Sequence, residues 1–382
     1  MAQPIDNVPL LDVTRGNQSV QDEIQAAIVR VIASGRFVYG PDCQQLEAEI
    51  AALCQCKFGI GCASGSDALL LALMAIGIEP DDEVILPSFT FFATGSAIVR
   101  LGARPVFVDI EPDTLNIDTR QIQAAITPKT KAIIPVHLFG QCAAMEVIQS
   151  IAADHNLLVV EDAAQAVAAS RHNRPAAGWG DLGCFSFYPT KNLGAFGDGG
   201  MIVTNDEDLA KQIRLIANHG MQPRYHHQIV GINSRLDSLQ AAVLRIKLTQ
   251  LEQWNQQRHT NAQRYFSLLS DAQLDSHVQL PVALDDSVHV WNQFTIRVAN
   301  QQRDALREHL QSNGIGTEIY YPIPIHQQPC FQEYAASVSL PVTEAAAAEV
   351  LSLPIFPELT AAEQERVVET IRGYFATRQA AA

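Results

Sequence analysis

Hydrophobic residues follow two alternating patterns along the first two-thirds of the chain. Short apolar runs rich in β-branched residues, each followed by turn residues, predict buried strands. Between these runs, apolar residues recur at the spacing of one helix face. The predicted strands are 82–88, 103–110, 131–138, 156–163, 184–189 and 200–205. The predicted helices are 21–34, 42–53, 67–76, 143–155 and 206–217. This alternation predicts an α/β fold with a mostly parallel central sheet and helices on both faces.

The pattern changes in the last third of the chain. Residues 235–265 keep only helical spacing, which predicts one long helix leaving the sheet. A mixed region follows, with a predicted strand, helix and Pro-containing loop at 289–298, 302–313 and 322–329. We therefore expect a large α/β domain over residues 1–250 and a smaller α+β domain over residues 251–382, on which residues 1–15 pack.

Composition and charge narrow the class of protein. The chain has 382 residues, 47% of them hydrophobic, and a formal net charge of −15, as expected of a soluble globular protein. The acidic excess argues against binding to nucleic acid or to an anionic membrane. The longest apolar run, Ala68–Ile78, is too short to span a bilayer, and the N-terminus lacks the basic segment of a signal peptide. Seven scattered cysteines indicate reduced thiols, and the scattered histidines do not suggest a metal site. We expect a cytoplasmic protein.

A lysine and an aspartate follow two of the predicted strands, at the sheet edge where ligands bind in such folds. Lys191 lies just beyond the strand 184–189 among small residues, where partial desolvation would give a free amine able to attack a carbonyl. Asp162 ends the strand 156–163, where a buried carboxylate needs a cationic partner. Pyridoxal phosphate needs such a pair, an amine for its aldehyde and a carboxylate for its ring nitrogen. Each residue also has a structural alternative, a surface lysine beside a turn and a helix N-cap.

A candidate phosphate site precedes the apolar helix predicted at 67–76. Gly65 and Ser66 stand at its start, where the helix dipole favours an anion, and Ser186 could add a second hydroxyl. Ser66 could instead be an ordinary helix cap. Phe91 could stack on a flat ring or pack in the core.

Several motifs together resemble the DegT/DnrJ/EryC1/StrS family of nucleotide-sugar aminotransferases, which have the fold-type I architecture of pyridoxal phosphate enzymes. In chain order they are ASGSDAL, DEVILPSFTFFAT, VHLFGQ, VVEDAAQA, SFYPTKNLGAFGDGG, NHG, GINSRLDSLQAA and YYPIPIHQQP. The resemblance implies that Lys191 binds the coenzyme and moves protons, and that Asp162 contacts the ring nitrogen. It implies that Phe91 covers the ring and that Gln165 lies against the ring hydroxyl.

The same resemblance implies how the phosphate is bound and how the protein assembles. Gly65, Ser66 and Ser186 would bind the phosphate, and Asn233 would reach it from the neighbouring subunit of a homodimer. Because relatives with histidine in place of this lysine act as dehydratases, Lys191 favours amino transfer.

The resemblance also suggests the substrates. The family implies L-glutamate as amino donor and the keto sugar of a nucleoside diphosphate as acceptor. The motifs around residues 224–242 and 320–329 look most like the branch that aminates C3 of a UDP-2-acetamido-3-oxo sugar, particularly the uronic acid used for bacterial surface polysaccharides such as the O-antigen. Arg235 would then hold a substrate carboxylate, or else form an ion pair with Asp237 or another acid at the start of the long helix. Tyr321 and His326 would line the sugar pocket, although a loop histidine is more often structural.

Three other interpretations compete with C3 amination. The first is amination at C4 by a member of the same family. The second is a dinucleotide-dependent dehydrogenase, since GIGCAS (59–64) has two glycines of the Gly-x-Gly-x-x-Gly pattern, but Ser64 takes the third place. The third is a regulatory protein that binds the coenzyme without turnover.

Overall fold

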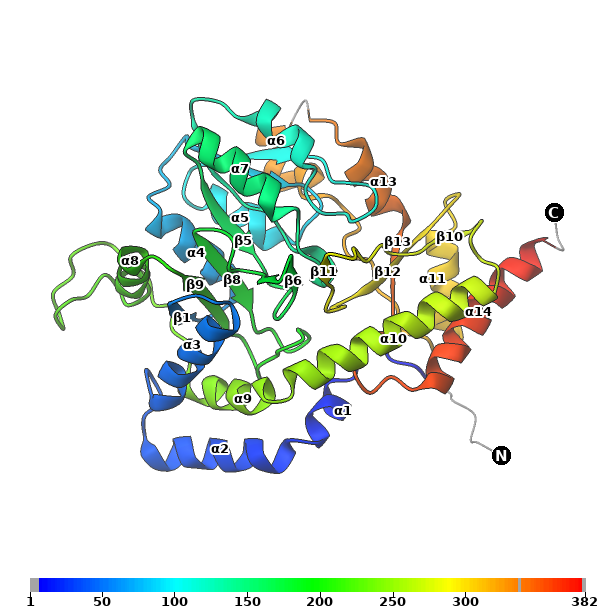
Figure 1. Ribbon diagram of the computed structural model, residues 1–382, viewed down its shortest axis with the longest axis horizontal. Coiled ribbons are helices and arrows are strands. Elements are labelled where there is room, and N and C mark those ends of the chain that lie inside the picture. Colours follow the sequence, from blue (N-terminus) through cyan, green and yellow to red (C-terminus); the bar gives the residue numbers. More distant parts are fainter. Residues whose placement is uncertain (1–6, 336–337, 380–382) are drawn as a thin grey trace.

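The central sheet dominates the computed structural model, which describes residues 7–335 and 338–379 (Figure 1). Within these ranges it has seven strands in the order β1–β9–β8–β5–β4–β2–β3. The strands are β1 (Phe58–Cys62), β2 (Glu83–Pro87), β3 (Arg104–Val108), β4 (Thr130–Ile133), β5 (Leu158–Asp162), β8 (Leu182–Ser186) and β9 (Gly200–Thr204). Strand β9 runs antiparallel to both of its neighbours, whereas the β3–β2–β4–β5–β8 pairings are all parallel. The predicted α/β fold with a mostly parallel sheet is confirmed.

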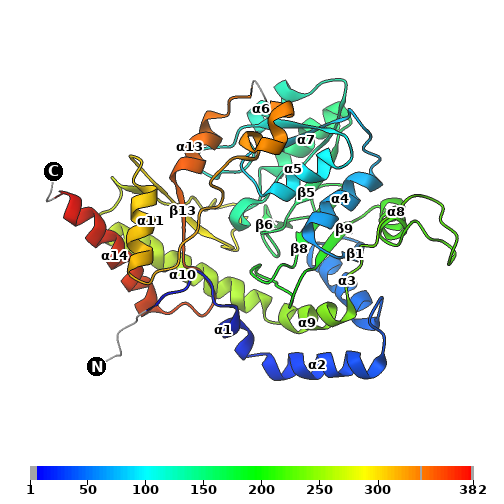
Figure 2. The same ribbon diagram turned by 180° about the vertical axis from the view of Figure 1, so that it is seen from behind.

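Helices cover both faces of this sheet, as Figures 1 and 2 show from opposite sides. One face packs against α4 (Gly65–Ala75), α5 (Phe92–Val99) and α8 (Glu207–Ala217). The other packs against α3 (Pro41–Leu53), α6 (Thr119–Ala125), α7 (Met145–His155) and α9 (Ser238–Leu248). Side chains of β5 alternate between these layers, with Val160 in the first core and Val159 in the second. The last two residues of β5, Glu161 and Asp162, therefore point to opposite faces.

Strand β1 was not predicted, because two glycines interrupt its hydrophobic pattern. Gly59 is required by close packing, since a Cβ at this position would lie 2.4 Å from the carbonyl oxygen of Glu47 in α3. Gly59 and Gly61 both lie inside the strand rather than in a turn that opens a helix. This placement removes the structural basis of the dinucleotide-binding interpretation.

The predicted long helix over residues 235–265 is two helices, and the prediction of a single helix is wrong. Helix α9 ends at Leu248, and α10 (Leu251–Asp271) begins after a short turn. The hydroxyl of Thr249 donates to the carbonyl of Ile246 (2.8 Å), a local bond that competes with the helical ladder. We propose that this turn is the boundary between the two domains.

The C-terminal part of the chain builds a separate small sheet in the order β10–β12–β13. Its strands are β10 (Val278–Gln279), β12 (Phe294–Val298) and β13 (Val350–Leu353), with α11 (Arg303–Ser312) and α14 (Ala361–Gln379) beside them. Strand β12 is shorter than predicted because the positive φ of Trp291, 48°, turns the chain before it. Val8 pairs with this region through its N–H and carbonyl groups, which bond Gly314 and Gly316.

The remaining elements are short or peripheral. They are α1 (Val13–Gln18), α2 (Gln21–Ser34), β6 (Ser170–Arg171), β7 (Arg174–Pro175), β11 (Ser287–Val288), α12 (Gln332–Ala335), α13 (Pro341–Glu349) and three 3₁₀ turns at Leu138–Gly140, Ile325–Gln327 and Pro329–Phe331. Among the described residues, no helix combines the length and apolar character that a bilayer crossing requires.

Candidate active site

Lys191 and Asp162 meet at the carboxyl ends of two adjacent parallel strands. Asp162 ends β5 and pairs in register with Cys184 of β8, and Lys191 lies in the turn that follows β8. The backbone N–H of Lys191 donates to the carbonyl of Tyr188 (2.9 Å), which fixes that turn. Burial lowers the pKa of the Lys191 amine to about 8, against the opposing pull of Asp162. Near neutral pH a minor fraction of Lys191 is therefore an uncharged nucleophile, but a much larger one than of an ordinary surface lysine.

The Asp162 carboxylate is buried, with 5% of the residue exposed. Burial raises its pKa, while hydrogen bonds from Thr94 Oγ1 to Oδ2 (2.8 Å) and from Ala164 N–H to Oδ1 (3.2 Å) oppose that shift. Residues 163–169 form turns rather than a helix, so the helix-cap interpretation of Asp162 is wrong. A buried acid held in this way can keep a proton on a facing ring nitrogen.

Thr94 was not predicted to be a site residue, although the motif that contains it, DEVILPSFTFFAT, was part of the family resemblance. It lies in the first turn of α5, fully buried, and its hydroxyl is also 2.9 Å from that of Thr90. Only the folded chain reveals that α5 brings these hydroxyls to the end of β5.

Helix α4 begins beside Ser186 and offers an anion site. Ser64 caps the helix by accepting a hydrogen bond from the N–H of Asp67 (3.1 Å), so Ser66 is not the cap. The exposed Ser66 instead stands in the first turn, beside unpaired N–H groups of the helix. A Cβ on Gly65 would lie 2.6 Å from the Cβ of Ser186, so glycine allows the two segments to meet. The structure thus brings Gly65, Ser66 and Ser186 together at a helix N-terminus, which suits a phosphate.

Aromatic and amide side chains gather near Asp162. Gln165 accepts a hydrogen bond from the N–H of Phe139 (2.7 Å) and donates to the hydroxyl of Tyr321 (3.2 Å). Burial, reinforced by Asp162, raises the pKa of Tyr321, so its phenol stays protonated. The ring of Phe91 lies 6.0 Å from that of Tyr321 and is 57% exposed. An exposed aromatic ring beside this group is available to cover a flat ligand.

His326 lies in a different environment. It is buried, with Nδ1 2.6 Å from the hydroxyl of Ser88 and Nε2 3.5 Å from Glu344. Burial lowers the pKa of His326. These contacts favour a structural role over the predicted contact with a sugar.

Asn233 and Arg235 lie on the segment between α8 and α9. Arg235 donates from Nη1 to Oδ1 of Asn218 (3.1 Å), and within the described residues it forms no ion pair with Asp237 or another acid. The side chain of Asn233 is exposed. Its neighbour Ser234 accepts a hydrogen bond from the N–H of Ala63 (3.2 Å), which places the segment close to the start of α4.

These residues together fit pyridoxal phosphate, because they provide a desolvated amine, a buried carboxylate, a helix N-terminus for a phosphate and an exposed aromatic ring. The fold and this set of side chains define a pyridoxal phosphate-dependent enzyme. Residues 18–372 match the DegT/DnrJ/EryC1/StrS aminotransferase family, and the chain belongs to that family. The predicted enzyme class and cofactor are confirmed.

Three relatives illustrate the range of names within this family. A protein of Geobacillus stearothermophilus, called pleiotropic regulatory protein, is 49% identical over 97% of this chain and 99% of its own length. A UDP-N-acetyl-3-dehydro-α-D-glucosamine 3-aminotransferase of Acidithiobacillus ferrooxidans is 45% identical over 96% of this chain and 97% of its own length. A UDP-2-acetamido-2-deoxy-3-oxo-D-glucuronate aminotransferase of Pseudomonas aeruginosa is 42% identical over 93% of this chain and 97% of its own length.

Two solved structures share the fold over nearly the whole chain. DesV of S. venezuelae, in complex with a ketimine intermediate, has a TM-score of 0.93 and 43% identity, and the match covers 97% of this chain and 99% of DesV. NtdA of Bacillus subtilis, with the cofactor PMP bound, has a TM-score of 0.90 and 35% identity, covering 97% and 85%.

Proposed function

We propose that this enzyme transfers an amino group from L-glutamate to C3 of a UDP-linked 2-acetamido-3-oxo sugar or uronic acid. The observation that carries the proposal is the meeting of Lys191 and Asp162 at the ends of β5 and β8, beside the anion site of α4. The names of the relatives from A. ferrooxidans and P. aeruginosa support the nucleotide, the acetamido sugar and C3. The product would serve amino-sugar or surface-polysaccharide synthesis.

Each residue of the site has a role that its surroundings support. The N-terminus of α4, with Ser66 and Ser186, binds the phosphate. Asp162 keeps the ring nitrogen protonated, and Phe91 covers one face of the ring. When bound, the coenzyme supplies an aldehyde that carries the amino group and a ring that withdraws electrons from the substrate carbon. The amine of Lys191 would hold the coenzyme through that aldehyde, and it is the group placed to move a proton to and from the substrate carbon.

The test of the proposed function uses the purified protein. Addition of L-glutamate should change the absorbance of the bound coenzyme, and addition of the correct keto sugar should reverse it. A panel should vary the nucleotide (UDP or dTDP), the keto position (C3 or C4) and the group at C6. A coenzyme spectrum that does not respond to L-glutamate would favour the regulatory alternative, which the name of the G. stearothermophilus relative brings forward. A response to C4 ketones alone would replace C3 amination by the C4 alternative.

We propose that two copies of the chain form a homodimer with shared sites. Large apolar side chains are exposed near the site and on the segments around it, and water contact with them is unfavourable. They include Phe37 (46%), Tyr39 (36%), Tyr188 (53%), Phe196 (46%) and Tyr225 (73%). A second copy would cover them, and Asn233 of the partner subunit would reach the phosphate.

Mixed dimers of two inactive variants test this arrangement. Lys191→Ala lacks the amine, and Asn233→Ala lacks the proposed phosphate contact. If Asn233 acts across the interface, each mixed dimer contains one complete site, and mixing should restore activity. If Asn233 acts within its own subunit, neither site is complete and mixing should restore nothing. Light scattering at several concentrations measures the dimer itself.

A further inference from the structure

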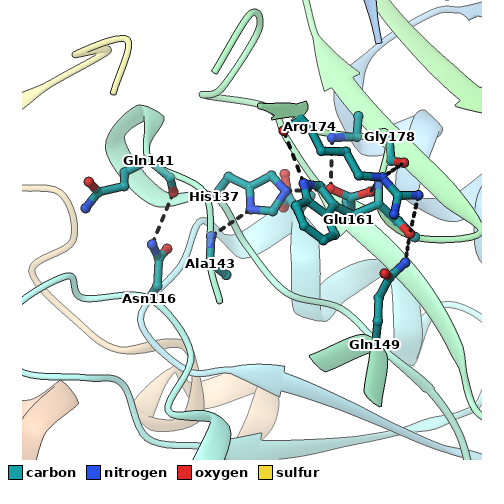
Figure 3. A network of polar contacts seen from close by, with 12 residues as sticks. Asn116, His137, Gln141, Ala143, Gln149, Glu161, Arg174 and Gly178 are labelled. Carbon is teal, nitrogen blue, oxygen red and sulfur yellow. Dashed lines mark hydrogen bonds and ion pairs between the residues drawn. The ribbon is translucent and has the colours of Figure 1, made fainter. Parts of the chain in front are cut away.

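Glu161 is a fully buried acid for which the reaction has no direct use. It lies next to Asp162 in sequence, but because side chains alternate along β5, its own points to the opposite face. Figure 3 shows Glu161 beside the ring of His137. Its carboxylate accepts four hydrogen bonds from donors on two other segments. The donors are His137 Nε2 (2.8 Å) and the N–H groups of Ala177 (2.8 Å), Trp179 (2.7 Å) and Gly180 (2.5 Å).

The hydrogen-bond pattern fixes where the protons lie. The N–H of Ala143 donates to Nδ1 of His137 (3.2 Å), so Nδ1 carries a lone pair and Nε2 carries the hydrogen. His137 is therefore neutral and donates to Glu161. All partners of Glu161 are donors, so only a carboxylate satisfies every one of them. An amide in its place would set its own N–H₂ group against donors.

The same network reaches both residues that face the coenzyme ring. The backbone N–H of His137 donates to the carbonyl of Asp162 (3.0 Å). Two residues further on, the N–H of Phe139 donates to the side chain of Gln165. Asn116 braces the same loop, since its side chain bonds the N–H of Leu138 (3.0 Å) and the carbonyl of Gln141 (Figure 3). The loop that starts at His137 is thus tied to Glu161 through the His137 side chain and to Gln165 through the N–H of Phe139.

We propose that Glu161 and His137 are positioning residues for the coenzyme, which they do not touch. By clamping the loop 137–143 against the end of β5, they fix Asp162 against the ring nitrogen and Gln165 against the ring hydroxyl. The proposal rests on the assigned roles of Asp162 and Gln165. It does not depend on the identity of the sugar or of the amino donor.

Asp109 provides a matched control for a merely structural role. It is also a buried acid at a strand end, and among the described residues its carboxylate accepts only from backbone N–H groups, those of Ile110 (2.9 Å), Val342 (3.0 Å) and Thr343 (2.7 Å). It follows β3, at the edge of the sheet, three strands away from β5. Asp109→Asn therefore measures the cost of placing an amide among backbone donors without disturbing the coenzyme.

The test uses three site variants and two readouts other than turnover. Glu161→Gln replaces one acceptor oxygen by an N–H₂ donor and removes the charge. His137→Asn keeps an acceptor for Ala143 but loses the donor to Glu161, and His137→Gln keeps the donor. The first readout is the Kd of the coenzyme for the apoprotein. The second is the pH midpoint at which the absorbance of the lysine-bound coenzyme changes.

Glu161→Gln and His137→Asn should weaken coenzyme binding on the order of tenfold, the cost of one misplaced hydrogen bond to a charged group. They should also move the pH midpoint upward. A coenzyme ring that has lost its proton withdraws fewer electrons, so the Lys191 nitrogen bonded to the coenzyme becomes more basic. His137→Gln should lie closer to wild type, and Asp109→Asn should lower only the melting temperature. If Glu161→Gln does not fold, the comparison of His137→Asn with His137→Gln tests the proposal. Both His137 variants leave the Glu161 carboxylate with its three backbone donors, so they are expected to fold.

Two results have distinct meanings. If the site variants lower only the melting temperature, with unchanged coenzyme Kd and pH midpoint, Glu161 and His137 are structural and the proposal is overturned. If the wild-type protein binds coenzyme but does not respond to L-glutamate, the proposed function fails while this proposal stands.

Discussion

Replacing Thr94 by valine tests whether the hydroxyl beside Asp162 sets the acidity of the site. Valine keeps the shape of threonine and removes one oxygen. Thr94 gives its single hydroxyl hydrogen to Asp162, so the hydrogen between Thr90 and Thr94 must come from Thr90. The variant therefore leaves both Asp162 and Thr90 short of a partner in a buried place.

The size of the effect follows from this geometry. A buried hydrogen bond to a charged group contributes about 1.5–3 kcal/mol. Loss of the Thr94 bond, which favours the charged carboxylate, should therefore raise the pKa of Asp162 further, in the same direction as burial already does. Asp162 is then protonated over more of the acid range and holds the ring proton less firmly. We expect the rate of the L-glutamate half-reaction to fall by about 10- to 100-fold, with its acid limb at higher pH.

Rapid-mixing absorbance measurements across the acid and neutral range check this expectation. Thr94→Ser keeps the hydroxyl and should restore most of the rate. Thr90→Val removes only the second hydroxyl and should have a smaller effect in the same direction. An acid limb in Thr94→Val that coincides with that of the wild type would refute the assigned role of the hydroxyl.

Three further predictions concern the amine, the phosphate and the sugar. Because burial lowers the pKa of Lys191 to about 8, the fraction of its reactive neutral form grows as the pH rises. The rate at which the apoprotein binds the coenzyme aldehyde should therefore increase with pH and level off above about 8, and a flat profile in a stopped-flow absorbance measurement would contradict this. Gly65→Ala places a Cβ 2.6 Å from that of Ser186 and should weaken coenzyme binding on the order of tenfold in a fluorescence titration. Unchanged binding would show that the phosphate does not bind beside Gly65. Arg235→Ala should raise the KM of uronate sugars on the order of tenfold more than that of neutral ones, and equal losses would assign Arg235 to the structure instead.

The catalytic pair was predictable because its signal is local. Asp162 and Lys191 each follow an apolar run, and ligand sites lie at strand ends in such sheets. The order of the strands decides whether two such ends meet, and no local pattern states that order. The partners of the pair were not predictable for the same reason, since Thr94 and Asp162 lie 68 positions apart in sequence.

Other features depend on packing that the sequence does not display. Three small residues, Ser64, Gly65 and Ser66, could each start α4. The cap falls on Ser64 because the helix begins at Gly65, two residues before its predicted start. The break at Thr249 is a single side-chain bond inside an otherwise helical pattern. His326 stands in a loop of ordinary appearance, and its burial against Ser88 arises only when that loop folds over β2.

The end of β5 carries two consecutive acids that serve opposite layers of the protein. Side-chain direction alternates along a strand, so loss of a single residue upstream would swing both acids to the wrong layer. The shorter one would then meet N–H groups placed for the longer, and the longer one would crowd the amine of Lys191. Strand β5 can exchange one apolar residue for another, but its length is fixed to the residue.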